Sequence, residues 1–259
     1  MPQTIDTLSG KKIYFASDFH LGVPTKNKSL EREKRIVSWL DQVKKDAHSI
    51  YLLGDIFDFW FEYKHAIPKG FIRLQGKLAE LTDAGIPVIF FTGNHDMWMF
   101  SYFTEELNIP IYRKPQQLVV DGKKLLIGHG DGLGPGDHTY KILKKVFSSK
   151  LCQWLFARIH PNAGIGIANF WSRKSRISSS GEDDRFMGDK EFLWQYCKQV
   201  EQKEHHDYYI FGHRHLPLNL EVGEHSRYFN LGEWVNFQTY GTYDGEKFEL
   251  HTFEKEDSL

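Results

Sequence analysis

The chain has 259 residues, of which 41% are hydrophobic and 26% are charged, a globular composition that excludes a disordered chain. The two cysteines, Cys152 and Cys197, are too few for a disulfide framework or a sulfur-ligated metal, and the net charge of −1 gives no reason to expect a polyanion partner. No apolar run approaches the roughly 20 residues that span a bilayer, and the first residues lack the apolar region of a secretory signal. We therefore expect a cytoplasmic or peripheral protein.

The first half of the chain alternates between predicted strands and helices. Five short apolar runs have the β-branched or aromatic content of buried strands: 13–16, 50–53, 88–91, 125–127 and 208–211. Apolar side chains recur at helical spacing over 36–43, before the second run, and over 71–81, before the third. Such alternation requires crossover connections, so it predicts an α/β domain with largely parallel strands.

After Gly128 this alternation ends. Residues 138–160 and 186–203 are predicted to be helical, and a Gly/Ser-rich stretch from Asn162 to Gly181 is predicted to separate them. The last part, about 208–253, has short alternating strands and a turn at Asp244-Gly245. We expect one core formed by residues 1–137 and 191–259, with a helical insertion at 138–190.

Each predicted strand is followed at once by Asp, Asn or His. These residues are Asp18 and His20; Asp55 and Asp58; Asn94, His95 and Asp96; His129 and Asp131; and His213 and His215. In an open α/β sheet, ligands bind beyond the carboxyl ends of the strands, so these side chains can converge on one crevice. Glycines precede Asp55, Asn94, His129 and His213, where they allow a sharp turn or a close approach to an ion.

Metal ions are the simplest explanation for so many ligands in one crevice. Without positive charge, such residues would repel one another and lose hydration, and the alternative is an unrelated set of strand-end caps. Nitrogen and oxygen ligands suit Mn²⁺, with Fe²⁺, Zn²⁺ or Mg²⁺ as alternatives, and disfavour a structural zinc. The ligands are too many for one ion with an open position, so we expect two divalent ions about 3.5–4 Å apart that share a carboxylate. Such a pair predicts phosphoester or pyrophosphate hydrolysis.

Five blocks of the sequence resemble the signature of the calcineurin-like metallophosphoesterases. The blocks are DFHLG (18–22), GDIFDFW (54–60), GNHD (93–96), GHGD (128–131) and GHRH (212–215). The resemblance implies a sandwich of two sheets flanked by helices. It also implies two metal sites that share Asp55 as a bridge: one formed by Asp18, His20, Asp55 and His215, the other by Asp55, Asn94, His129 and His213. It further implies that His95 faces the scissile phosphate as general acid or charge stabiliser, with Asp96 orienting it.

Within that family, the chain is most similar to the branch that cleaves UDP-2,3-diacylglucosamine to UMP and 2,3-diacylglucosamine 1-phosphate in lipid A biosynthesis. The second block, LGEW (231–234) and the helical insertion carry this resemblance. In that branch the insertion is a cap that receives the acyl chains. His95 is a departure, because the best-known members carry Arg there. The chain is then either a divergent branch of the same enzyme or a relative that acts on another pyrophosphate or phosphodiester.

The insertion combines positive charge with apolar bulk. From Lys141 to Arg176 there are eight Lys or Arg and no acidic residue, so this segment carries +8 and the rest of the chain −9. Ordinary packing of helices on the core explains most of its apolar side chains. Apolar bulk together with positive charge is typical of an element that binds an anionic membrane or an anionic lipid. A nucleic-acid surface would not use so many aliphatic residues, so we expect no nucleic-acid partner.

These features predict a two-metal hydrolase of a nucleotide-linked lipid, peripheral on the cytoplasmic face of the inner membrane. We expect Asn94, His95 and His213 to contact the substrate at the metals. In the insertion we expect Arg173, Lys174 and Arg176 to hold phosphate or headgroups, and Asp137 and Ser172 to bind the sugar. Two alternatives remain: the same catalyst acting on a soluble phosphomonoester or phosphodiester, which the apolar insertion disfavours, and a non-catalytic scaffold, which the complete ligand set disfavours.

Overall fold

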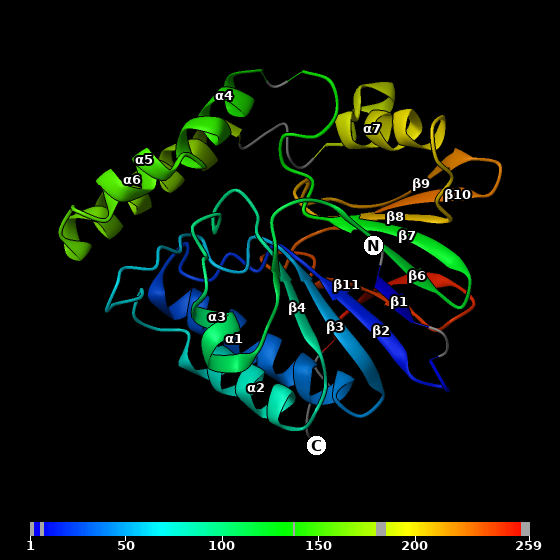
Figure 1. The fold of residues 1–259 in the computed structure, drawn as a ribbon, viewed down its shortest axis with the longest axis horizontal. Helices are drawn as coiled ribbons and strands as arrows, with labels where there is room; N and C mark the ends of the chain where they lie inside the picture. Colours follow the sequence, from blue (N-terminus) through cyan, green and yellow to red (C-terminus); the bar gives the residue numbers. More distant parts are fainter. Residues whose placement is uncertain (1–2, 6–7, 137, 180–184, 255–259) are drawn as a thin grey trace.

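The computed structural model describes residues 3–5, 8–136, 138–179 and 185–254, and its described strands form two six-stranded sheets (Figure 1). The first sheet has the order β1 (Gln3–Ile5), β6 (Gln116–Val120), β7 (Lys123–Gly128), β8 (Tyr208–Phe211), β10 (Ser226–Leu231) and β9 (Pro217–Gly223). The second has the order β12 (Phe248–Thr252), β11 (Thr239–Tyr243), β2 (Lys12–Ala16), β3 (Ala47–Leu53), β4 (Val88–Phe91) and β5 (Ile111–Tyr112).

The five strands predicted from apolar runs are all present, and their predicted parallel pairing is confirmed within each sheet. β2, β3 and β4 are parallel neighbours, as are β7 and β8. The five strands are divided between the sheets, because β7 and β8 belong to the first sheet and the other three to the second. Two sheets flanked by helices are the arrangement that the family resemblance implies.

Helices cover the outer face of each sheet. α1 (Lys26–Val43), α2 (Ile72–Asp83) and α3 (Tyr102–Leu107) pack on the second sheet, and α7 (Phe192–Glu201) packs on the first, preceded by a 3₁₀ turn at Gly188–Lys190 (Figure 1). The buried side chains of α1 include Ile36, Leu40 and Val43, which lie on one face at helical spacing. A further apolar layer joins the two sheets, with Phe15, Tyr51 and Phe229 among its side chains. Two packed sheets therefore hold the loops at their carboxyl ends in fixed positions.

Three helices, here called the cap helices, lie outside this sandwich: α4 (His138–Phe147), α5 (Lys150–Phe156) and α6 (Pro161–Ser179). The helix predicted over 138–160 is interrupted, because Ser149 begins a new helix by accepting a hydrogen bond from Cys152 N at 3.2 Å. The prediction that 162–181 separates helices is wrong over most of its length, since α6 occupies it. Gly164 lies within this helix, and an added Cβ there would lie 2.5 Å from Tyr63 Oη, so the helix approaches the core closely at this glycine.

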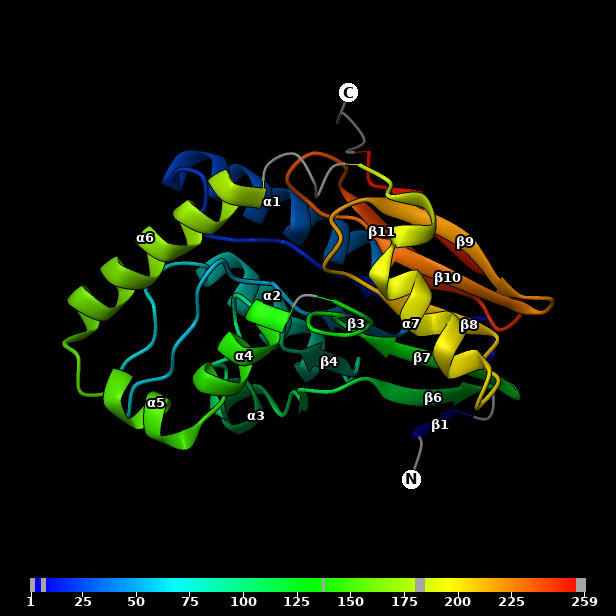
Figure 2. The ribbon, with the colours of Figure 1, turned by 90° about the horizontal axis from the view of Figure 1, so that it is seen from above.

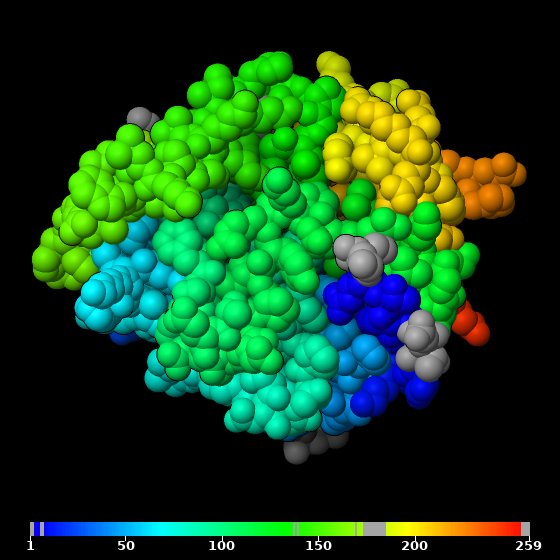
Figure 3. Space-filling model, in the orientation of Figure 1, coloured from blue at the N-terminus to red at the C-terminus, as the bar shows by residue number. Residues whose placement is uncertain are grey.

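Aromatic side chains attach the cap helices to the core. The Phe156 ring lies 4.6 Å from the Trp98 ring and 4.7 Å from the Phe61 ring, centroid to centroid. Trp98 Nε1 also donates to the Phe147 carbonyl at 2.8 Å. Seen from above, α6 lies apart from α4 and α5, with loops of the core visible between them (Figure 2), and in space-filling form the insertion makes a ridge along one side of the molecule (Figure 3). Among the described residues, no helix is both long and apolar enough to cross a membrane.

Candidate metal centre

The loops that follow β2, β3, β4, β7 and β8 bring the expected metal ligands together. Four of these ligands are almost completely buried: Asp18, His20, Asp55 and His129. Five have left-handed backbone, with φ between 44° and 70°: Asp18, His20, Asp55, His213 and His215. Residues other than glycine rarely adopt this conformation, and where they do, it is often at a functional site.

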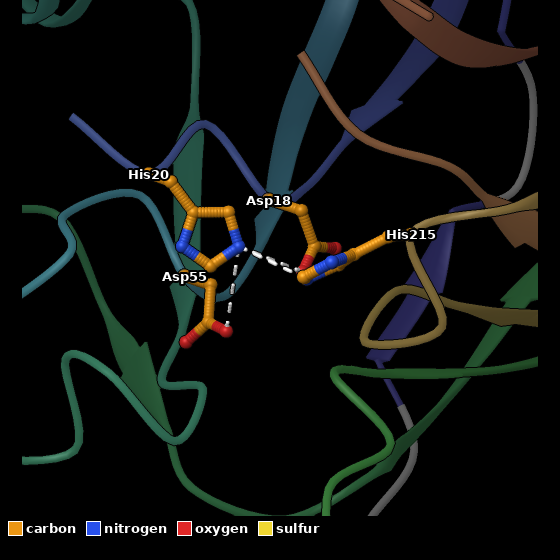
Figure 4. A group of neighbouring side chains, drawn as sticks. All are labelled: Asp18, His20, Asp55 and His215. Atoms are coloured by element: carbon orange, nitrogen blue, oxygen red, sulfur yellow. Dashed lines mark hydrogen bonds and ion pairs between the residues drawn. The ribbon is translucent and has the colours of Figure 1, made fainter. Parts of the chain in front are cut away.

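One group of ligand atoms is formed by Asp18, His20, Asp55 and His215, all within 4.8 Å of one another (Figure 4). The Nε2 atoms of His20 and His215 are 3.0 Å apart, and Asp18 Oδ1 is 3.2 Å from His215 Nε2. Asp55 Oδ2 is 3.9 Å from His20 Nε2. Nitrogen and oxygen atoms bound to one ion at about 2.0–2.2 Å have separations of this size. This group can therefore hold one divalent ion.

The second group shares Asp55 with the first. Ligand atoms of Asp55, His129 and His213 lie within 4.8 Å of one another, and Asn94 Oδ1 is 3.3 Å from His129 Nε2. His129 Nδ1 donates to the Leu53 carbonyl at 2.8 Å, since a carbonyl can only accept. That bond fixes the tautomer and leaves His129 Nε2, which is 3.3 Å from Asp55 Oδ2, as the metal-binding atom.

Unsatisfied oxygen atoms test whether these residues fit metal ions. Asp18 Oδ1 and Asp55 Oδ2 are buried and accept no hydrogen bond. A buried carboxylate oxygen without a donor is costly unless positive charge lies near it. Here these oxygens face imidazole nitrogens, which are themselves metal ligands. The donor set therefore fits divalent cations, with Asp55 placed where a bridging carboxylate would be.

The pKa values of the histidines also favour a site for divalent cations. Burial lowers the pKa of His20 to about 3 and that of His213 to about 4, so both are neutral imidazoles, the form that binds metals. Burial also opposes a charge on His129, but the Asp55 carboxylate beside it raises the pKa of His129 to about 10. Positive charge is thus favoured beside Asp55, where the two groups of ligands meet.

Two glycines allow the turns of the site to touch. An added Cβ on Gly54 would lie 2.7 Å from Gly93 N and from His129 Nδ1, and one on Gly93 would overlap the Asp55 carboxylate. Any side chain at either position would therefore push apart the loops that carry Asp55, Asn94 and His129. At Gly54 and Gly93 the close approach is between loops of the protein, and the approach to an ion that the sequence suggested stays a prediction.

His95 lies beside these ligands, but the expectation that Asp96 orients it is wrong. His95 Nδ1 donates to the Asp58 backbone carbonyl at 3.0 Å and lies 3.5 Å from Asp58 Oδ1. The buried Asp96 carboxylate instead accepts from Gly93 N at 2.7 Å and Ile56 N at 2.8 Å. Its oxygens are used in fixing the turns after β3 and β4. Burial and the nearby Asp55 carboxylate raise the pKa of Asp96 to about 7.

Asp58 is also a residue of this site, although the sequence indicated no role for it. Its Oδ1 lies 3.6 Å from His20 Nδ1, and its Oδ2 accepts from Ser172 Oγ at 2.7 Å. Ser172 belongs to α6 and is buried, so a cap helix reaches the residue that contacts both His20 and His95. The position of Asp58, three residues after Asp55, was the one indication in the sequence that it belongs to the site. Nothing in the sequence indicates its contact with Ser172, which lies 114 positions away.

The remaining predicted contacts in the insertion are only partly described. Asp137 lies outside the described residues. Arg173, Lys174 and Arg176 contribute backbone to α6, and their side chains lie outside the described part of the chain.

Asp131, in the fourth block, anchors the first cap helix. Lys144 Nζ is 2.7 Å from Asp131 Oδ2, and Tyr140 Oη donates to the same oxygen at 2.5 Å. Asp131 therefore joins α4 to the loop that carries His129.

The calcineurin-like phosphoesterase model matches residues 11–217, a span that includes every expected metal ligand. The chain belongs to the calcineurin-like phosphoesterase family. As a calcineurin-like phosphoesterase it is a metal-dependent hydrolase. A UDP-2,3-diacylglucosamine hydrolase from Porphyromonas gingivalis is 34% identical over 256 residues, 94% of this chain and 98% of the relative. A protein of the same name from Histophilus somni is 28% identical over 227 residues, 86% of this chain and 92% of the relative. A third, from Actinobacillus succinogenes, is 26% identical over 224 residues, 86% and 92% of the two chains.

Proposed function

We propose that this calcineurin-like phosphoesterase hydrolyses the pyrophosphate of UDP-2,3-diacylglucosamine to UMP and 2,3-diacylglucosamine 1-phosphate, a step of lipid A biosynthesis. The observation that carries this proposal is the 34% identity to the Porphyromonas gingivalis UDP-2,3-diacylglucosamine hydrolase over 94% of this chain and 98% of the relative. At that coverage the similarity extends through most of the insertion as well as the core.

The proposed catalyst uses two divalent ions, with Mn²⁺ as first choice for a nitrogen and oxygen ligand set. Asp18, His20, Asp55 and His215 would hold one ion, and Asp55, Asn94, His129 and His213 the other. When bound, the ions would supply hydroxide at neutral pH and neutralise charge on the phosphate oxygens. The short N···N and N···O separations and the two unsatisfied carboxylate oxygens support this assignment.

His95 is proposed to act on the scissile phosphate through Nε2. Because Nδ1 donates to the Asp58 carbonyl, Nε2 is the ring nitrogen left for the substrate. That nitrogen carries a proton only when the ring is positively charged, so His95 can serve as a general acid or as a charge on the phosphate in its imidazolium form. Asn94 and His213 would contact the same phosphate. Asp96 would contribute by holding the turns that carry Asp55 and Asn94.

Residues 138–190 are proposed to form a cap on a core of residues 1–137 and 191–259. Its support is an apolar surface that the cap helices leave open to solvent. Leu151 is 68% exposed, Trp154 54% and Phe170 64%. Single exposed apolar side chains are normal on a monomer, but several large ones on the cap helices favour a surface that binds an apolar partner. Acyl chains would cover such side chains, while Arg173, Lys174, Arg176 and Asp137 would bind polar parts of the substrate.

The same surface supports a peripheral position on the cytoplasmic face of the inner membrane. Eight Lys or Arg without an acidic residue accompany the exposed apolar groups between Lys141 and Arg176. Each basic residue near an anionic bilayer contributes about 1 kcal/mol of attraction, which salt weakens. A substrate with two acyl chains is itself a membrane component, so an enzyme that binds the membrane meets its substrate there.

Release of UMP from UDP-2,3-diacylglucosamine in mixed micelles tests the proposal. We expect release with added Mn²⁺, loss after chelation, and recovery when Mn²⁺ is restored; Asp55→Asn is the inactive control. If the wild type cleaves a small chromogenic phosphodiester but not the lipid, the soluble-substrate alternative replaces the proposal. If it binds Mn²⁺ and cleaves neither compound, the scaffold alternative does.

A further inference from the structure

Arg214 stands between two metal ligands, His213 and His215, in the loop after β8. Its side chain is 3% exposed and pairs with Glu191, which is completely buried. Arg214 Nε donates to Glu191 Oε2 at 2.9 Å, and Nη2 donates to Oε1 at 3.0 Å, a bidentate pair. Nη2 also donates to the Arg185 carbonyl at 3.1 Å. The ligand loop is thus tied to the segment between α6 and α7.

Glu191 is itself held in place at the start of α7. Its Oε1 accepts from Met187 N at 3.0 Å, and its backbone N donates to the Gly188 carbonyl at 3.0 Å. The next residue, Phe192, lies with its ring 6.1 Å from the His213 ring and 5.8 Å from the Arg214 guanidinium carbon. The acidic partner is therefore a fixed support for the arginine.

The loop needs such a support because of its backbone. His213 has φ 70° and His215 has φ 54°, both left-handed. A non-glycine residue keeps this conformation only where its surroundings enforce it. On one side, His213 N donates to Asp18 Oδ2 at 3.0 Å. On the other side, the Arg214 side chain is bound to Glu191, so the loop is restrained from both directions.

Stability alone does not explain a buried pair at this position. Replacing a buried ion pair by apolar residues of similar volume is often neutral or stabilising, because the charges lose their hydration. The same sheet offers a contrast in Arg227 and Glu221, an exposed pair 3.6 Å apart that touches no ligand. The feature that distinguishes Arg214 is its place between two ligands that belong to different metal sites.

We propose that Arg214 and Glu191 are positioning residues that hold His213 and His215 in their metal-binding conformation. This inference rests on the metal sites of the proposed function, but not on its substrate. Since His215 serves the first group of ligands and His213 the second, loss of the pair weakens both sites together. Loss of a single ligand such as His215 would weaken chiefly its own site.

The test is direct Mn²⁺ binding to the full chain by calorimetry, with folding followed by circular dichroism. In the double variant Arg214→Met/Glu191→Met, which replaces the pair by apolar side chains, we expect a native spectrum and about 10–100-fold weaker binding at both sites, the usual effect of losing a group that orients metal ligands. The matched control is Arg227→Met/Glu221→Met, the same double substitution at the exposed pair, which should bind Mn²⁺ as the wild type does.

Arg214→Lys is the second variant, since it keeps the charge and loses the bidentate geometry. We expect it to fold and to bind Mn²⁺ with intermediate affinity. If the double variant does not fold, the Mn²⁺ affinity of Arg214→Lys tests the positioning role instead. Wild-type affinity at both sites in either folded variant would overturn the proposal. A wild-type protein that binds two Mn²⁺ but releases no UMP would refute the proposed substrate and leave the positioning role intact.

Discussion

The hydrogen bond between Ser172 and Asp58 joins α6 to the metal centre, and Ser172→Ala removes it. Ser172 Oγ is 2.7 Å from Asp58 Oδ2, and the two residues are only 8% and 2% exposed. A hydrogen bond to a charged group contributes about 1.5–3 kcal/mol. Its loss should therefore lower the equilibrium constant for docking of α6 on the core by about 10–140-fold, because each 1.4 kcal/mol corresponds to a factor of ten.

Two measurements follow this shift. Amide hydrogen exchange in α6 should become faster in Ser172→Ala, because the docked state is less populated. Since Asp58 also contacts His20 and His95, kcat should fall for a small chromogenic phosphodiester as well as for the diacyl substrate. Ser172→Thr keeps the hydroxyl and should retain most activity. Ser149→Ala removes a hydroxyl that bonds to Val146 and Cys152 of the cap helices, and it should leave the small-substrate rate unchanged.

One result would refute this reasoning. If Ser172→Ala raises KM for the diacyl substrate alone, with exchange in α6 and the small-substrate rate unchanged, then Ser172 binds the sugar, as first expected from the sequence. In that case the contact with Asp58 has no influence on the metal centre.

Three further predictions concern the centre and the cap. Asp55→Asn should abolish turnover with the fold intact, because both ions lose their shared anion, whereas His20→Ala should be partly rescued by excess Mn²⁺; equal rates for Asp55→Asn and wild type at saturating metal would contradict the bridge. His95→Ala should lower kcat by about 10²–10⁴-fold at unchanged metal content. His95→Arg should keep more activity than His95→Ala if the residue acts by charge. Loss of metal in the alanine variant would show that His95 is a ligand. Reversing Arg173 and Arg176 to Glu should raise KM for the diacyl substrate and weaken binding to anionic vesicles in a salt-dependent way, with small-substrate hydrolysis nearly unchanged; an unchanged ratio of the two activities would count against a lipid substrate.

The metal centre was largely predictable because its signals are local. Each ligand follows an apolar run, so a short window of sequence identifies both the strand and the polar residue at its end. Asp18 and His20 illustrate this, since they follow β2 within a few positions. The parallel pairing of β2, β3 and β4 was predictable for a similar reason, because helices separate these strands in the chain.

What the sequence did not reveal depends on contacts between distant segments. Nothing near Asp58 indicates Ser172, and nothing near Arg214 indicates Glu191. α6 was missed because glycine has a poor helix propensity, yet at Gly164 the absence of a Cβ lets the helix lie close to Tyr63. Asp96 was given the wrong partner because sequence proximity to His95 does not show that its carboxylate faces the backbone.

The left-handed backbone of the ligands decides which substitutions give interpretable results. Asp18 and Asp55 have φ of 56° and 52°, values that asparagine tolerates better than most residues. Asp→Asn at either position therefore removes a negative charge and leaves the chain path in place. A β-branched or larger residue at the same position would change the turn as well as the charge. Loss of activity in such a variant could then come from a displaced loop as readily as from a lost ligand. Asp→Asn at these two positions separates the loss of the ligand's charge from a change in the loop.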